Sequence, residues 1–184
     1  MRVTGGKARG IPLRVPSGPV RPATDYLRES VFNSLAAFVP GARILDLFAG
    51  TGSYALESLS RGARSAVCVD RMTADVIRQN AAAVAKSMAL AALPLEVVTG
   101  DALGFVPPAA DFDLVFADPP WELWEREAAV IAAVAVRAAT LSEDPRLILE
   151  APGGFTVPIP EGWRLHKVLG KGKGQPAATI LRRA

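Results

Sequence analysis

The sequence predicts an α/β fold with a mostly parallel, seven-stranded sheet that ends in an antiparallel hairpin. Short apolar runs alternate with amphipathic stretches along most of the chain, as in sheets covered by helices on both faces. The chain has 184 residues, of which half are hydrophobic, enough for one domain with a substantial core. We therefore expect a single domain over 1–184, with a hairpin and helix over 1–40 and the α/β core over 41–184.

The first forty residues predict a small extension. Residues 2–15 alternate weakly around GGKARG, which indicates a short hairpin with a basic loop. Thr24 is suited to cap a helix, and Pro40 with Gly41 ends that helix. Apolar residues recur at helical spacing between these limits, at Leu27, Val31, Leu35 and Phe38.

The sheet is predicted from seven runs. Five apolar runs are expected to form parallel strands, at 42–47, 65–69, 95–99, 113–117 and 146–151. Helices are expected between them near 54–61, 73–91 and 122–141, with room only for a short helix before the fourth strand. The tail segments 163–170 and 177–183 flank a Gly/Lys turn and are expected to pair antiparallel at the sheet edge.

Composition limits the class of protein. No apolar run approaches the roughly 20 residues of a membrane span, and MRVTGGKARG lacks a signal core, so we expect a cytoplasmic protein without membrane contact. One cysteine and one histidine exclude an internal disulfide and a Cys/His metal cluster. We expect a monomer without a metal ion.

The glycine turn after the first strand allows two interpretations. Gly50, Gly52 and Ala55 fit the dinucleotide pattern G-x-G-x-x-A, and Asp70 follows at the expected distance, so a dehydrogenase or a non-catalytic nucleotide-binding module is one candidate. Asp46, however, would repel a pyrophosphate. It would attract the ammonium and sulfonium of S-adenosylmethionine, so charge favours the methyl donor.

Four successive strands end in aspartate, at Asp46, Asp70, Asp101 and Asp118. The carboxyl ends of parallel strands meet at one edge, where open α/β sheets bind ligands. Asp70 is suited to accept hydrogen bonds from ribose hydroxyls, and Asp101 from the adenine amino group. The alternative is that these aspartates only cap the helices that follow them.

The segment Asp118-Pro119-Pro120-Trp121 predicts the acceptor site. A carboxylate and the Pro119 carbonyl can accept hydrogen bonds from an exocyclic amine as charge develops on its nitrogen, and two prolines restrict the backbone that holds them. Trp121 offers a face for stacking. This motif indicates amino methylation but leaves adenine, cytosine, guanine and a glutamine amide open. The lone thiol, Cys68, lies within a strand and is expected to pack in the core, which excludes a cysteine nucleophile.

Three segments, RPATDYLRESVFNSL, ILDLFAGTGSYALESLSRGA and FDLVFADPPW, resemble the RsmD family in order and spacing, and the likeness runs over almost the whole chain. The resemblance implies a class I S-adenosylmethionine-dependent methyltransferase with a Rossmann-like fold that modifies the N2 amine of a guanine in small-subunit (16S) ribosomal RNA. The small size and the lack of a sequence-reading domain argue against the alternative, a DNA adenine methyltransferase.

The resemblance also implies site residues. The donor would be held by Asp46, Phe48, Gly50, Gly52, Asp70, Arg71, Asp101 and Ala102. Thr24 and Arg28 would lie at its methionine end, where Arg28 can pair with the carboxylate; an ion pair with Glu29 is the alternative. Asp118 to Trp121 would hold the guanine, with tryptophan in place of the usual tyrosine or phenylalanine. Asp70-Arg71 replaces the commoner Glu-Lys pair.

Basic residues concentrate at the two ends of the chain. Residues 1–28 and 160–184 each hold six basic groups and one acid, whereas the middle is acidic. Solvated tails are one interpretation. The other is a phosphate-binding rim around the active-site mouth, formed by Arg2, Lys7, Arg9, Arg14, Arg21, Lys171 and Lys173. We expect structural roles for His166, Trp124 and Trp163.

Overall fold

A computed structural model describes residues 1–15, 25–170, 172 and 174–184. Its centre is a seven-stranded sheet in the order β3-β2-β1-β4-β5-β7-β6. Strands β1 to β5 run parallel, and β7 runs antiparallel to its neighbours β5 and β6. The predicted parallel sheet with a terminal hairpin is confirmed.

The strands begin and end within one or two residues of the predicted runs. Their bounds are β1 Arg43–Leu47, β2 Ser65–Asp70, β3 Leu95–Thr99, β4 Leu114–Ala117, β5 Arg146–Pro152, β6 Trp163–Leu169 and β7 Pro176–Arg183. Strands β1, β4 and β5 are almost entirely buried because helices cover both faces, and β2 is buried at every position but Ser65, Val67 and Asp70, which are half-buried.

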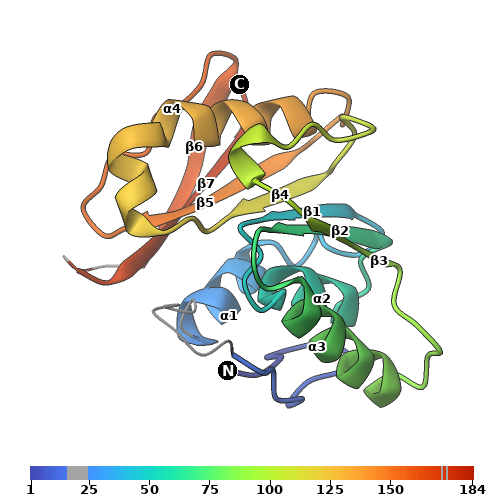
Figure 1. Ribbon diagram of the computed structural model, residues 1–184. Coiled ribbons are helices and arrows are strands. Elements are labelled where there is room, and N and C mark those ends of the chain that lie inside the picture. Colours follow the sequence, from blue (N-terminus) through green and yellow to red (C-terminus); the bar gives the residue numbers. More distant parts are fainter. Residues whose placement is uncertain (16–24, 171, 173) are drawn as a thin grey trace.

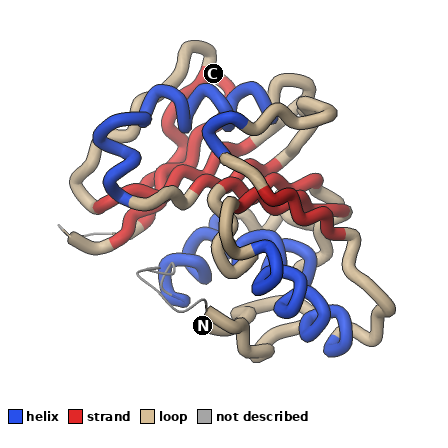
Figure 2. The backbone as a smooth tube through the Cα atoms, in the orientation of Figure 1, coloured by secondary structure: helices blue, strands red, loops and turns tan. Residues whose placement is uncertain are grey.

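Helices divide between the two faces of the sheet (Figure 1). Their bounds are α1 Asp25–Ser34, α2 Ser53–Ser60, α3 Ala74–Ser87, η1 Ala102–Gly104 and α4 Trp121–Ala138. Helices α1, α2 and α3 lie on the face that also carries the N-terminus, and α4 and η1 lie on the other (Figures 1 and 2). The two cores reflect this division, since Phe32 of α1 packs with Phe116 in one and Trp124 of α4 packs with Leu149 in the other.

The N-terminal segment forms the predicted hairpin in a short form. Arg2 and Pro12 make an antiparallel bridge, and Val3 N donates to the Ile11 carbonyl at 2.9 Å while Gly10 N donates to the Val3 carbonyl at 2.8 Å. The loop of this hairpin also docks on the end of α2, where Lys7 N donates to the Ser60 carbonyl at 2.8 Å. Gly6 has φ +76°, and a Cβ there would lie 2.1 Å from the Ser60 oxygen, so this glycine serves close packing against α2.

Helix α1 is shorter than predicted at its C-terminal end. It ends at Ser34, and the chain continues in turns through Phe38 and Val39, both of which donate backbone hydrogen bonds to Leu35. The guanidinium of Arg146 lies 4.2 Å from the centroid of the Phe38 ring. The apolar residues therefore keep helical spacing past Ser34 because the turns that follow the helix also pack against the core. The predicted cap, Thr24, lies outside the described residues.

Candidate active site

The glycine turn between β1 and α2 has an unusual backbone. Phe48, Gly50 and Gly52 all have positive φ, of 59°, 55° and 76°. This region is strained for the non-glycine Phe48. A Cβ on Gly52 would lie 3.0 Å from Ile77 of α3, whereas one on Gly50 would meet only the Phe48 carbonyl, at 3.9 Å. The turn therefore packs tightly against α3 at Gly52 and leaves open space beside Gly50.

Asp70 braces this turn from the end of β2. Its Oδ2 accepts a hydrogen bond from Gly50 N at 2.9 Å, and its Oδ1 accepts from Met72 N at 2.8 Å and from Thr73 N at 3.0 Å. The carboxylate thus joins two loops at the edge of the sheet and also serves the start of α3. Arg71, beside it, is exposed.

Asp46 is buried behind the turn. Its side chain accepts a hydrogen bond from Ala55 N at 3.1 Å. Burial raises the pKa of its carboxyl to about 8; the Ala55 hydrogen bond opposes this rise, and the charge of Asp70 adds to it. A cation placed nearby would lower this pKa again.

Asp101 follows β3 at the start of η1. It is exposed, and its side chain accepts a hydrogen bond from Leu103 N at 3.1 Å, while Ala102 is buried. Three of the four predicted aspartates, Asp46, Asp70 and Asp101, therefore accept backbone hydrogen bonds from the element that follows them. The capping alternative describes part of their role.

The diproline segment lies next to the glycine turn. Strands β1 and β4 are neighbours, with Leu47 opposite Ala117, and Asp118 N donates to the Leu47 carbonyl at 3.4 Å. Pro119 is buried, Pro120 is exposed, and Trp121 is half-buried as the first residue of α4. The elbow thus starts where the predicted mechanism requires it, beside the turn expected to hold the donor.

The carboxyl group of Asp118 is electrostatically unusual. Within the part of the chain that the structure describes, no group donates a hydrogen bond to it. Burial raises its pKa well above the ordinary value, and the charges of Glu150 and Asp46 raise it further. Asp118 thus differs from the other three aspartates, because none of the described residues uses its acceptor capacity.

Two site residues, Glu150 and Tyr54, were missed by sequence reasoning. Glu150 is 3% exposed near the end of β5, and its Oε2 accepts a hydrogen bond from the Tyr54 hydroxyl at 2.7 Å. Tyr54 stacks on Phe116 with ring centroids 4.6 Å apart. The sequence carried a signal for Glu150, because the fifth apolar run, RLILEA, also contains an acid near its end.

Arg28 is fully buried. It forms ion pairs with Asp25 at 2.8 Å and with Glu57 at 3.6 Å, and its Nη2 donates to the Arg2 carbonyl. The ion pair expected as the alternative thus exists, but with these two acids rather than with Glu29. Nε and Nη1 make no hydrogen bond with the described residues. Contact with the donor's methionine end stays a prediction for Arg28, and Thr24 lies outside the described residues.

The predicted basic rim divides into two groups. Arg2, Lys7, Arg9 and Arg14 are exposed, and Arg21, Lys171 and Lys173 lie outside the described residues. Lys7 and Arg9 belong to the loop docked at Ser60, at the opposite end of α2 from Gly52, a helix length of about 12 Å. The fold does not bring this loop to the glycine turn, so its contact with RNA stays a prediction.

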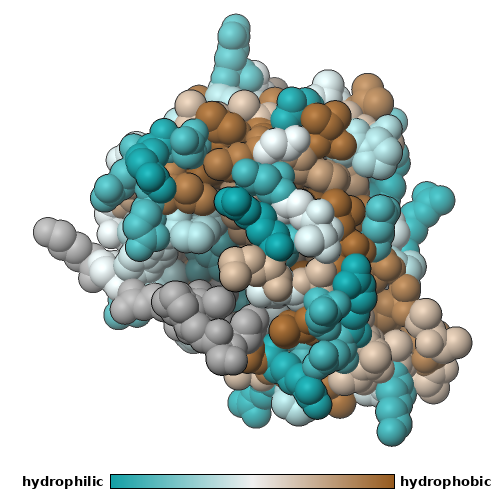
Figure 3. All heavy atoms as spheres, viewed as in Figure 1, coloured by the Kyte–Doolittle hydropathy of each residue, from teal (hydrophilic) through white to brown (hydrophobic). Residues whose placement is uncertain are grey.

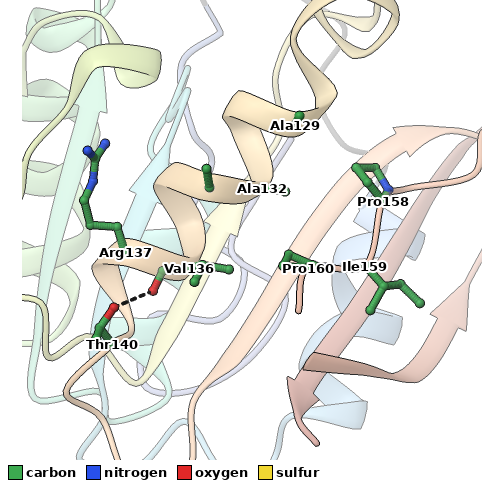
Figure 4. A pocket seen from close by; sticks show the side chains of 9 residues that line it. Ala129, Ala132, Val136, Arg137, Thr140, Pro158, Ile159 and Pro160 are labelled. Atoms are coloured by element: carbon green, nitrogen blue, oxygen red, sulfur yellow. Dashed lines mark hydrogen bonds between the residues drawn. The ribbon is translucent and has the colours of Figure 1, made fainter. Parts of the chain in front are cut away.

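A separate pocket lies away from these residues. It has a volume of about 500 Å³ and is formed by one side of α4 and the segment 158–160, with Ala132, Val136 and Pro160 facing each other across it (Figure 4). None of the predicted site residues lines it. In the view of Figure 3, apolar and hydrophilic side chains are interspersed over the visible surface.

The other residues for which the sequence predicts structural roles are Cys68, Trp124, Trp163 and His166, and the first two pack in the core. Cys68 is fully buried in β2, and Trp124 is 1% exposed, with Nε1 donating to the Glu150 carbonyl at 2.7 Å. Trp163 is half-buried against the α4 core, and His166 is exposed on β6. Among the described residues, none of the helices combines the length and apolarity that a membrane crossing requires.

Comparisons with known proteins agree on one family. A family model described as conserved hypothetical protein 95 matches residues 1–180. The chain is 32% identical to ribosomal RNA small subunit methyltransferase D of Escherichia coli, over 100% of this chain and 90% of the relative. It is 30% identical to the protein of that name from Haemophilus influenzae, over 91% and 86%.

Solved structures give the same result. The structure named "putative methyltransferase yhhF", from Escherichia coli, superposes with a TM-score of 0.81 at 30% identity and covers 100% of this chain and 97% of its own. A Thermus thermophilus protein of 27% identity gives a TM-score of 0.74 over 98% of both chains. The fold is the class I, Rossmann-like methyltransferase fold, and the chain belongs to the RsmD family.

Proposed function

We propose that this protein transfers a methyl group from S-adenosylmethionine to the N2 amine of a guanine in small-subunit ribosomal RNA. The observation that carries the proposal is the position of the Asp118-Pro119-Pro120-Trp121 elbow beside the glycine turn. The names of the Escherichia coli and Haemophilus influenzae relatives support the ribosomal substrate. A fold neighbour of 15% identity, with a TM-score of 0.67, is complexed with SAH.

The residues of the turn fit the donor. Open space beside Gly50 permits close approach of a ligand to the backbone. Asp46, buried with a raised pKa, suits a cationic ligand because a positive charge favours its ionised form. In this proposal Asp70 accepts hydrogen bonds from the ribose hydroxyls and Asp101 from the adenine amino group, and Phe48, Gly52, Arg71 and Ala102 complete the donor site. When bound, S-adenosylmethionine supplies a methyl group on a positively charged sulfur.

The elbow provides the acceptor half of the site. Asp118 has unused acceptor capacity, and Pro119 holds its carbonyl on a backbone with restricted φ. Both oxygens accept hydrogen bonds from the guanine amine more strongly as its nitrogen gains positive charge, which lowers the barrier. Trp121, at the start of α4, offers its ring face to the base. The protein's own contribution is to orient the amine and accept its protons.

Nucleoside analysis of methylated RNA tests the proposal. Small-subunit particles and naked RNA from cells lacking the gene, with DNA as a third substrate, are incubated with the protein and labelled S-adenosylmethionine, then digested for mass spectrometry. We expect N2-methylguanosine from ribosomal RNA. Asp118→Ala should slow its formation about 100-fold or more and leave S-adenosylhomocysteine affinity nearly unchanged.

Asp111→Ala is the matched control, because Asp111 pairs with Arg43 at the opposite end of β4; it should retain activity. Methylated adenine from DNA would replace this proposal with the rival acceptor. Calorimetric binding of NAD, without binding of S-adenosylhomocysteine, would overturn it in favour of a dehydrogenase or nucleotide-binding module.

A further inference from the structure

Glu150 lies beside Asp118 on the same face of the sheet. Ala117 and Leu149 are partners in the β4–β5 ladder, so the next residues along, Asp118 and Glu150, continue neighbouring parallel strands. Such strands are about 4.8 Å apart. Phe116 and Ile148, two residues earlier, both pack into the core under α1 and α2. Because side chains alternate along a strand, the two carboxyl groups project toward that same face.

The protein holds Glu150 in place from two helices. Its Oε2 accepts a hydrogen bond from Tyr54 of α2 at 2.7 Å, and its backbone carbonyl accepts from Trp124 of α4 at 2.7 Å. Within the described residues, no group donates to its Oε1. Buried polar groups normally have hydrogen-bond partners. Glu150 has one oxygen bonded and the other without a donor among the described residues, and Asp118 beside it has none. Core packing alone does not explain this pair of acids.

Among the residues that the structure describes, no cation pairs with both acids. Arg28 of α1 is the positive group that acts on Glu150, and it is already paired with Asp25 and Glu57. The other ionisable groups that act on the pair are Tyr54 and Asp46. Burial raises the pKa of Glu150 to about 7, despite the Tyr54 hydrogen bond and the Arg28 charge. Neighbouring carboxylates so placed, Glu150 buried and Asp118 half-buried, do not both ionise freely near neutral pH.

We infer that Glu150 is a positioning residue that shares one proton with Asp118 and thereby sets the pH above which Asp118 becomes a hydrogen-bond acceptor. The inference rests on the proposed function for its role in turnover. When the amine nitrogen forms its bond to the methyl carbon, the carbon–sulfur bond breaks with its electron pair going to sulfur. The nitrogen then releases one proton, and the ionised Asp118–Glu150 pair takes up that proton.

Glu150→Gln tests this role through the pH dependence of turnover. Without the negative neighbour Asp118 ionises more readily, so the acidic limb of the kcat profile should move to lower pH, by on the order of one unit. Tyr54→Phe should move it in the same direction by less, because loss of the hydroxyl makes Glu150 hold the proton. S-adenosylhomocysteine affinity should stay within a few fold in both variants.

Asp113→Asn is the matched control. It removes a carboxylate just before β4, where Arg43 and Ser142 already satisfy it, so the acidic limb should not move. A purely structural role for Glu150 predicts lower amounts of active protein with an unchanged profile. That outcome, in a folded Glu150→Gln or Tyr54→Phe protein, would overturn the inference.

A titration of the ligand-free protein separates this inference from the proposed function. Carbon-13 NMR of carboxyl-labelled Asp and Glu should show Asp118 and Glu150 titrating as a coupled pair above the ordinary carboxyl range in the wild type, with the signal of Asp46 identified by its loss in Asp46→Asn. One of them should be lost in Glu150→Gln while the other shifts to lower pH. If these signals are absent, the shared proton is refuted even where the protein methylates guanine. If they are present in a protein with no methyltransferase activity, the proposed function fails and the proton pair stands.

Discussion

Acidic side chains have opposite environments at the two ends of the same strands. At the amino ends, Arg43 pairs with Asp111 and Asp113, and Arg146 pairs with Asp144 at 2.5 Å. Asp113 also accepts a hydrogen bond from Ser142 at 2.7 Å. Hydrogen bonds from Arg43 and Ser142 lower the pKa of Asp113 although its partial burial opposes this, and the Arg146 hydrogen bond lowers that of Asp144.

At the carboxyl ends, Asp46, Asp118 and Glu150 form no ion pair with any residue that the structure describes. Burial raises the pKa of Asp46 to about 8, that of Glu150 to about 7 and that of Asp118 above its ordinary value. An uncompensated buried carboxylate destabilises the folded state at neutral pH. The amino end is thus arranged for stability. The carboxyl end retains negative charge that a cationic ligand and a proton-donating amine can satisfy.

The largest effect is expected from Asp70, which holds the two loops together at the carboxyl end. Asp70→Ala removes three hydrogen bonds from the backbone of Gly50, Met72 and Thr73. Each bond to a charged group contributes about 1.5–3 kcal/mol. The dissociation constant of S-adenosylhomocysteine should rise about 10- to 100-fold, the equivalent of about one such bond, because only part of the lost energy bears on the ligand site; calorimetry measures it.

Asp75→Ala is the control for Asp70, because Asp75 is an exposed carboxylate in the first turn of α3 that pairs with Arg78. It should bind the ligand as the wild type does. Equal affinity in the Asp70 and Asp75 variants would show that the brace does not shape the ligand site.

The sequence predicted the carboxyl end well because each part of its signal is local. An apolar run followed by aspartate marks a strand end, and Gly50 and Gly52 mark a turn with positive φ. Glu150 carried a similar local signal, but its position beside Asp118 follows from the strand order, which sets β5 next to β4. A residue's neighbour across a parallel ladder cannot be obtained from spacing along the chain.

Contacts between distant segments account for the other differences. The alternative to donor binding for Arg28 was an ion pair with Glu29 of its own helix, whereas one of its actual partners, Glu57, lies on α2. GGKARG forms the hairpin loop that its composition predicts, but the docking of this loop on Ser60 was not predicted. Local propensity cannot predict such docking, because its stabilisation comes from the surface against which the segment packs.

The stability of the ligand-free protein should depend on pH through Asp46. Its folded pKa of about 8 lies above the unfolded value of about 4, so its contribution is fully present below about pH 4 and is lost as pH rises toward 8. Glu150 acts in the same direction. Urea unfolding should show a falling free energy over this range, and Asp46→Asn should reduce the fall; an equal fall in the variant would contradict the assignment.

The smallest effect is expected at the amino end, from Asp113→Asn. The variant loses the ion pair with Arg43 and weakens the Ser142 contact, and since both charged side chains are about one third exposed, the loss should be about 1 kcal/mol. The pKa of Asp113 is lowered by folding, so its contribution is present above about pH 4 and is lost as pH falls. Its pH dependence is thus opposite to that of Asp46.

Urea unfolding at neutral and acidic pH checks this last expectation. The wild type should be more stable than Asp113→Asn at neutral pH, and the difference should shrink as the solution is acidified, while methyl transfer remains at the wild-type rate. Loss of activity with this variant would mean that the two ends of the sheet are coupled. The amino and carboxyl ends would then not be independent, because Asp113, whose partners are Arg43 and Ser142, has no direct contact among the described residues through which it could affect methyl transfer at Asp118.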